Sequence, residues 1–417
     1  MGSNCFFWSL RSTFPMPNIR TLTLMLAGLA MLGPFAIDTY LPAFKMIADD
    51  FGVADVLMQH TLSVYLLSFA FMSLFWGTLS DTFGRRPVII ASLVLFGIGS
   101  VGSALAPSYG WLLFFRGLQG CSAGAGRVVG QALVRDCYHG PEAQRLFANI
   151  AMVFSLAPAI APIIGGYLVT YVGWRAIFVT LSVLTLALLA ASFRALPETL
   201  SAERRQPMRL VPILRNYLRA VRNVQFLFAI MAVGFAFSGF GLYIASAAKF
   251  VIGILGLQET DFAWLFMPFI GGMVCGSLIS SRFAARVDPA RLIRIGMTIM
   301  SVGAAWNLGY NLLFAAAVPW AVVPIFVYGL GMSMALPGMT VVTLNTFPSM
   351  RGLASSVQST VQMLIFAMVS GIVAPLLYDR AVFLGAGMVG SAALCAGCWW
   401  MSRQLAANES GTQQPRE

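Results

Sequence analysis

Three charged side chains lie inside stretches of sequence that are otherwise apolar. Asp38 is the one acidic residue well within such a stretch, near the end of segment 21–41, and Arg116 and Arg127 lie within segment 110–134. An arginine at the centre of a membrane span costs about 2.5–3.5 kcal/mol to insert, so each should have a partner or line a hydrated cavity. A carboxyl group that gains and loses a proton near an arginine can couple proton movement to a change of shape.

The elements that position these residues are predicted to be membrane-spanning helices. Of the 417 residues, 59% are hydrophobic and 10% are charged, whereas a water-soluble domain needs a more polar surface. A span takes about 20 apolar residues. Twelve such segments are separated by short connections, which predicts an all-α membrane protein with twelve transmembrane helices in two six-helix halves. These segments are 21–41, 56–79, 87–106, 110–134, 145–170, 174–195, 224–248, 261–281, 291–314, 319–344, 353–377 and 381–402.

Basic residues are distributed unevenly between the two sides of these segments. With the termini inside, only Lys45, Arg175, Lys249 and Arg380 fall in connections on the outer side, and the large majority fall on the inner side. Lysine and arginine are retained in cytoplasmic loops, so both termini are predicted to be cytoplasmic in the bacterial inner membrane. The same bias accounts for the net charge of +11 without a nucleic-acid partner.

The longest polar connection divides the chain into two halves. From Pro212 on it is predicted either to form an amphipathic helix on the inner leaflet or to remain a solvated basic linker. Gly77-Thr-Leu79 and Gly276-Ser-Leu278 each close the second span of a half before a basic loop, a weak internal repeat. Either Met1 or Met16 is the start of the protein. The predicted regions are a tail at 1–20, a bundle at 21–195, a linker at 196–223, a bundle at 224–402 and a tail at 403–417.

A dense motif lies between the second and third spans. It reads Gly77-Thr-Leu-Ser-Asp81-Thr-Phe-Gly84-Arg85-Arg86 and resembles the signature loop of the major facilitator superfamily, G-x-L-[SA]-D-x-x-G-R-[RK]. Gly77 is predicted to permit close helix approach and Gly84 a tight turn. Asp81 is predicted to pair with the basic residues and to interact with helix ends. Such a loop is expected to hold the two halves together in one conformation and to release them in another.

Two further motifs contain the buried charges. Arg116-Gly-Leu-Gln119-Gly resembles the superfamily's R-x-x-Q-G motif, which is associated with proton coupling in antiporters. Asp38-Thr-Tyr40-Leu-Pro-Ala resembles the bicyclomycin-resistance and chloramphenicol-exporter family, Bcr/CflA. The resemblance implies a drug:proton antiporter, and the similar depths of Asp38 and Arg116 favour a proton-coupling pair. The alternative is that Asp38 caps or anchors the outer end of its span.

The fifth span carries a proline and glycine motif. It contains Pro158, Pro162, Gly165 and Gly166, and it resembles the antiporter motif of drug exporters, in which Ala161 is commonly a glycine. The prolines are predicted to bend the helix and the glycines to permit close packing. This resemblance favours export over import.

Several polar residues are candidates for the wall of a substrate cavity. Arg127 follows Arg116 by 11 residues, which places it about 16 Å further along the same face; the alternative is that it reaches to the cytoplasmic interface. Gln358 and Gln362 share one helix face, and the alternative for each is a hydrogen bond between helices. The predicted set is Tyr40, Gln119, Arg127, Gln358 and Gln362.

The function predicted from these residues is proton-coupled export of small drug-like molecules by alternating access. The partners are the substrate, protons and the lipid bilayer, and the chain is predicted to be a monomer. No enzymatic activity, cofactor or metal site is predicted, and the sequence has no G-x-x-x-x-G-K-[ST] motif for ATP. Two alternatives are an exporter of an endogenous metabolite, such as an amino acid or peptide-like compound, and a non-transporting receptor or intramembrane enzyme.

Overall fold

The computed structural model describes residues 19–138, 140–201, 203, 205, 210–283 and 286–412, and the regular elements in these ranges are all helical. Nine helices among these residues are long and apolar enough to cross a membrane. The three remaining predicted spans are helical too. Segment 110–134 is divided at Gly124 into α6 (Tyr109–Ala123) and α7 (Ala125–Cys137), 145–170 lies in α8 (Gly140–Tyr171), and 291–314 lies in α13 (Pro289–Leu313). The predicted fold class is therefore confirmed.

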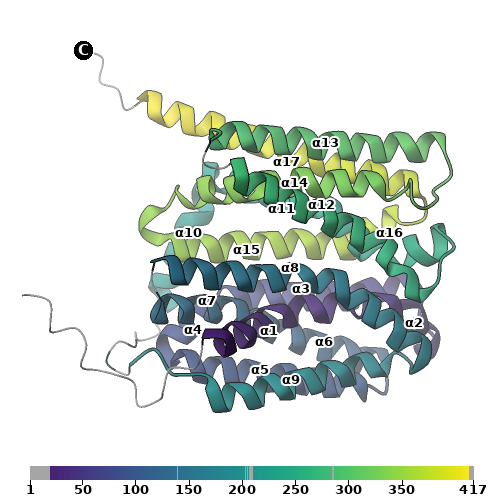
Figure 1. Ribbon diagram of the computed structural model, residues 1–417, viewed down its shortest axis with the longest axis horizontal. Coiled ribbons are helices and arrows are strands. Elements are labelled where there is room, and N and C mark those ends of the chain that lie inside the picture. The colour runs from purple at the N-terminus through teal and green to yellow at the C-terminus, as the bar shows by residue number, and fades with distance from the viewer. Residues whose placement is uncertain are drawn as a thin grey trace, which may run out of the picture.

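The helices up to residue 195 form the lower part of Figure 1. Helix α5 illustrates why they form, because it is apolar on every side: Val88 and Phe96 are buried within the protein, while Ile98 and Val101 remain exposed. A helix that is apolar all round is suited to a lipid environment. The other elements are α1 (Ile19–Asp38), the short turn η1 (Leu41–Ala43), α2 (Phe44–Phe51), α3 (Asp55–Ser73), α4 (Trp76–Phe83), α5 (Arg85–Ala104) and α9 (Arg175–Ala195).

The helices from residue 224 form the upper part of Figure 1. Here glycines let backbones meet: a Cβ on Gly272 or Gly276 would overlap carbonyl groups of Phe326 and Leu330. The elements are α11 (Val224–Ala245), the turns η3 (Lys249–Ile254) and η4 (Glu259–Phe262), α12 (Ala263–Phe283), α14 (Val323–Leu344), η5 (Pro348–Met350), α15 (Arg351–Met368), η6 (Val369–Val373), α16 (Ala374–Leu377) and α17 (Ala381–Thr412).

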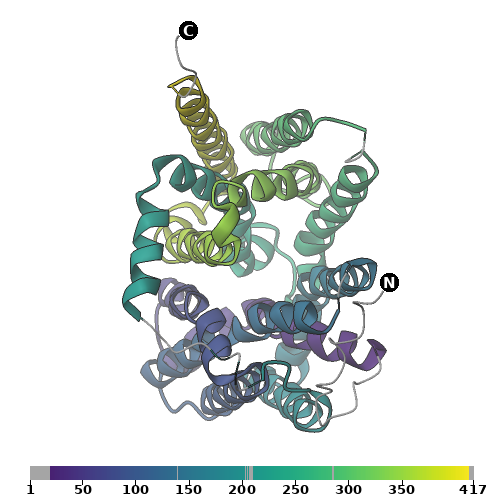
Figure 2. The same cartoon turned by 90° about the vertical axis from the view of Figure 1, so that its left-hand side faces the viewer.

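The bundle has two ends, named here the Arg85 end and the Lys249 end after a residue at each. Figure 2 looks onto the Arg85 end, where α10 (Leu210–Arg222) runs alongside both parts of the molecule. The Tyr217 hydroxyl of α10 donates to the Leu74 carbonyl at 2.6 Å, and the fully buried Ala220 packs with Phe226 and Ala354. The linker thus contains a helix, as in the first of the two alternatives, and this helix packs against residues of both parts.

Candidate functional site

Arg116 lies fully buried between two aromatic rings. Its guanidinium carbon is 4.5 Å from the centre of the Tyr40 ring and 4.4 Å from that of Tyr65. Its Nη1 donates to the Ala36 carbonyl at 3.2 Å and to Gln119 Oε1 at 3.0 Å. A desolvated cation–π contact is worth about 2 kcal/mol. Two of them offset much of the insertion cost of a buried arginine, about 2.5–3.5 kcal/mol.

Asp38 ends α1 two residues after Ala36 and is 3% exposed. Among the described residues, no ion pair within 4.0 Å includes Asp38 or Arg116, so the predicted direct pairing is absent from this conformation. Only Nη1 of the guanidinium is hydrogen-bonded among the described residues, to Ala36 and Gln119, while Nε and Nη2 lie buried between the two rings without a hydrogen-bond partner. The Tyr65 ring contacts the Arg116 guanidinium, and its hydroxyl donates to the Gly33 carbonyl at 2.9 Å. Nothing in the sequence distinguishes this tyrosine from other aromatic residues of its span.

A cavity of about 690 Å³ lies between the two parts of the molecule toward the Arg85 end. Residues of α3, α4 and α7 form one wall, residues of α15 form the opposite wall, and Tyr217 of α10 borders it. This volume is within the range of sites for drug-sized molecules.

Of the five residues predicted to line a substrate cavity, two lie on the wall of this cavity and three do not. Arg127 and Gln362 line the cavity. Tyr40 and Gln119 do not, because Tyr40 is buried against Arg116 and Gln119 is held between Arg116 and Ser100, whose hydroxyl accepts from Gln119 Nε2 at 2.8 Å. Gln358 faces another helix instead, and its Nε2 donates to the Thr340 hydroxyl at 3.3 Å.

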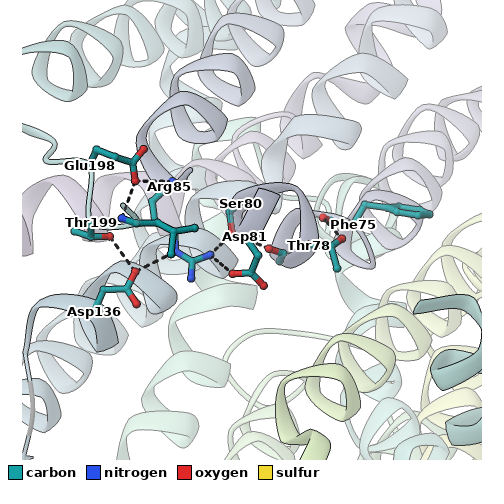
Figure 3. Close-up of polar contacts among 10 residues, drawn as sticks. Phe75, Thr78, Ser80, Asp81, Arg85, Asp136, Glu198 and Thr199 are labelled. Carbon is teal, nitrogen blue, oxygen red and sulfur yellow. Dashed lines mark hydrogen bonds and ion pairs between the residues drawn. The ribbon is translucent and has the colours of Figure 1, made fainter. Parts of the chain in front are cut away.

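The signature loop forms a charged cluster around Arg85, shown in Figure 3. Arg85 Nη1 is 2.6 Å from Asp81 Oδ1 and its Nε is 3.1 Å from Asp136 Oδ2. Its backbone N–H donates to Glu198 Oε1 at 3.0 Å, and the Thr199 hydroxyl donates to Asp136 Oδ2 at 2.9 Å. Asp136, Glu198 and Thr199 were not among the predicted site residues, although each is a polar residue within four positions of the end of an apolar segment.

The cluster ties together one part of the molecule. Every contact of Arg85 just described joins it to a residue between 80 and 200. The loop was expected to hold the two halves together in one conformation only, and in this conformation these contacts do not do so. The cavity lies between the Arg85 cluster and α15, although the hydroxyls of Ser73 on α3 and Thr360 on α15 are 2.8 Å apart beside it. Arg86 Nη2 instead donates to the Phe193 carbonyl of α9 at 2.7 Å.

The two glycines of the signature loop have different surroundings. Gly84 has a φ of 102°, which confirms the tight turn, and a Cβ there would overlap the Glu198 carboxylate. The expectation for Gly77 is wrong in this conformation, because Gly77 borders the cavity and a Cβ on it would meet nothing within 4 Å.

We expect Gly84→Ala to damage the protein and Gly77→Ala to be tolerated. A non-glycine residue in a sparsely populated backbone conformation costs about 1–3 kcal/mol, and the displaced Glu198 would also lose its bond to the Arg85 backbone. The thermal unfolding midpoint of each purified variant measures this difference. Equal midpoints would contradict the role assigned to the turn.

At the Lys249 end, the two parts of the molecule are in contact. Helix α8 continues through Pro158 and Pro162, and a Cβ on Gly165 would overlap the Thr39 carbonyl. A Cβ on Gly166 would overlap the Glu259 carbonyl of η4, which belongs to the other part of the molecule. The expected close packing of this motif is confirmed.

Side chains of α3 complete this contact. Gln59 Nε2 donates to the Ala245 carbonyl at 2.8 Å, and the Ser63 hydroxyl donates to the Ala367 carbonyl at 3.4 Å. We call this set of contacts, together with Gly166 against Glu259, the Lys249-end seal. These contacts join the two parts of the molecule at the Lys249 end, whereas the cavity lies between the two parts toward the Arg85 end.

Comparison with known proteins identifies the family. The family model described as Major Facilitator Superfamily matches residues 26–370. The chain belongs to the major facilitator superfamily. Members of this superfamily are transporters, so an intramembrane enzyme is excluded, and the chain is a multi-pass membrane transporter.

Relatives within the superfamily are concerned with drug resistance. A bicyclomycin resistance protein homologue of Haemophilus influenzae is 33% identical over 358 residues, covering 86% of this chain and 90% of that protein. The multidrug transporter MdfA of Edwardsiella ictaluri is 27% identical over 331 residues, covering 79% and 80%. The resemblance to the bicyclomycin-resistance group is therefore confirmed, and these relatives are named for bicyclomycin resistance and for multidrug transport.

A solved structure confirms the major facilitator fold. A bacterial homologue of the human lysosomal transporter Spinster, in an inward-facing and unoccupied conformation, has a TM-score of 0.70 at 16% identity. The match covers 94% of this chain and 98% of that one.

Proposed function

We propose that this protein is a proton-driven exporter of small drug-like molecules in a bacterial inner membrane. The observation that carries the proposal is the arrangement of cavity and seal: a cavity of about 690 Å³ borders the Arg85 end, while the Lys249-end seal closes the other. The basic connections place the Arg85 end in the cytoplasm. In this orientation the structure is the state that takes up substrate from the cell, and both termini are cytoplasmic.

Asp38 is the proposed proton carrier. An ionised carboxylate buried without an ion-pair partner among the described residues is costly, so Asp38 favours its protonated form when no substrate is bound. For net coupling it must release this proton toward the cytoplasm when substrate enters the cavity. Opening of the seal admits water to Asp38 and makes exchange of the proton with the outside possible. Arg116 supplies a fixed positive charge near the end of α1, and the rings of Tyr40 and Tyr65 hold it in place.

Alternating access then follows from the rocking of two halves, residues 21–195 and 224–402. Major facilitator transporters have midplane sites between repeated halves. Breaking the Lys249-end seal and closing the cavity around the signature loop would expose the region between the halves to the other side. In that closed state the Arg85 cluster is positioned to meet the second half.

The available energy is sufficient for resistance. One proton that crosses about 100–150 mV releases about 2.3–3.5 kcal/mol. At about 1.4 kcal/mol per tenfold, this supports an outward concentration ratio of about 50- to 350-fold for a neutral solute.

The test is transport by the purified protein in proteoliposomes. We expect uptake of radiolabelled chloramphenicol into vesicles whose lumen is acidic relative to the bath, and loss of this uptake when an uncoupler collapses the gradient. Uptake that is unaffected by the uncoupler would contradict proton coupling. No chloramphenicol transport, together with a metabolite that accumulates in the medium of overexpressing cells, would favour the metabolite exporter instead.

A further inference from the structure

The wall of the cavity carries more positive than negative charge. Among the described residues, its charged side chains are Arg85, Arg127, Arg135 and Arg351 against Asp81 and Asp136. Both carboxylates are within 3.1 Å of Arg85, and the four guanidinium groups still outnumber the two carboxylates. The described wall of the space between the halves therefore carries a net positive charge, and its two acidic side chains both lie beside Arg85.

One of these arginines lies deep in the cavity. Arg127 precedes Asp136 by nine residues on α7, which places it about 14 Å further from the Arg85 end. Its side chain is exposed although its helix lies within the bundle, and it lines the cavity, so its exposure is toward this space. Positive charge is thus present inside the cavity, where a bound solute would lie. The basic residues at the cytoplasmic mouth are accounted for by the orientation of the protein in the membrane, but Arg127 is not.

The surroundings of Arg127 are suited to an amphiphilic solute. Hydroxyl and amide groups of Ser356, Ser359 and Gln362 on α15 face the same cavity, and Phe69 and Met363 add apolar surface. Guanidinium groups bind carboxylates through charge-assisted, often bidentate hydrogen bonds. An apolar wall with a few placed polar groups is typical of small-molecule sites.

We infer that this cavity selects small organic anions, namely acids with an aromatic or aliphatic body whose carboxylate binds Arg127. Neutral solutes should bind less tightly than anions, and cations should bind most weakly because the positive wall repels cations. This inference rests on the proposed transport function, since it names the substrate class of the same cavity.

A probe series of one shape and three charges tests the inference. The full-length protein, purified in detergent, is titrated with 2-naphthoate, 2-naphthamide and 2-naphthylmethylammonium, and binding is measured by calorimetry. We expect naphthoate to bind most tightly and the ammonium compound most weakly. Arg127→Gln should weaken naphthoate binding by about ten- to a hundredfold, as the loss of hydrogen bonds to a charged group predicts, and naphthamide binding by less than about threefold.

Arg282→Gln is the matched control, because it removes one positive charge from the exposed end of α12, off the cavity wall. It should leave all three affinities unchanged.

Three results would each overturn the inference: equal or tighter binding of the amide or ammonium probe, unchanged naphthoate affinity in Arg127→Gln, or no binding of naphthoate. The titration measures binding without a proton gradient, so its result does not depend on whether transport is coupled to protons. If naphthoate binds preferentially but no gradient-driven transport is found, only the proposed export function is refuted. If chloramphenicol transport is driven by the gradient but the anion is not preferred, only the inference about substrate charge is refuted.

Discussion

Replacing Asp38 with asparagine should abolish export against a concentration gradient while leaving exchange of substrate for substrate intact. The amide keeps the shape of the carboxyl group but cannot bind and release a proton, so the two halves can still alternate with no energy supplied. The attainable concentration ratio should fall from a limit of about 50- to 350-fold to one. Proteoliposome uptake driven by a pH gradient, measured beside counterflow in the same preparation, reports both quantities.

Asp49→Asn is the control for this substitution. Asp49 is an exposed carboxylate eleven residues further on, in α2. Its replacement should leave both driven uptake and counterflow at the level of the unmodified protein. Driven uptake that survives in Asp38→Asn would remove Asp38 from the coupling mechanism, whereas loss of counterflow as well would indicate a structural role.

Gly166→Ala should shift the protein toward the state that is open at the Lys249 end. The added Cβ would overlap the Glu259 carbonyl across the Lys249-end seal, and a backbone atom in a packed turn cannot move aside cheaply. Overpacking of this kind costs about 1–3 kcal/mol. That cost changes the ratio of the two states by about five- to 150-fold, and transport should fall because the cytoplasmic-facing state becomes rare.

Labelling of a buried position measures this shift. Ala245 is 1% exposed in the seal, so Ala245→Cys, in a background without the native cysteines, should react slowly with a membrane-impermeant maleimide. Adding Gly166→Ala should speed this reaction, and adding Gly390→Ala should not, because a Cβ on Gly390 would meet nothing within 4 Å. Equal labelling rates in the two double variants would show that the glycine contact does not control the seal.

The twelve segments were predictable because the lipid environment imposes one simple requirement. A helix that faces lipid must be apolar over about 20 residues, and hydropathy along the chain records this directly. Helix α9, for example, begins and ends within one residue of the predicted segment 174–195. The break at Gly124 was not predictable, since a change of helix direction there depends on neighbouring helices and leaves hydropathy unchanged.

The candidate site was predictable in its charges but not in its partners. Asp38 and Arg116 stand out because a charge in an apolar segment is rare. Tyr65 does not stand out, because its contact with Arg116 depends on how two helices are rotated against each other. Gly77 shows the same limit: its motif indicates close packing, yet the chain in this conformation has a cavity there. A residue motif cannot show in which conformation its close packing occurs, so the surroundings of Gly77 in this conformation could not be predicted from the sequence.

The two rings around Arg116 also have a consequence for how the protein responds to acidity. Aromatic faces attract a cation through their quadrupole, which does not depend on a proton, so the hold of Tyr40 and Tyr65 on the guanidinium is the same in acidic and neutral surroundings. An arginine clamped by a carboxylate would instead be released whenever that carboxylate is neutralised. In the proposed mechanism, the two rings would therefore hold the positive charge of Arg116 in one place through the transport cycle, while Asp38 gains and loses its proton.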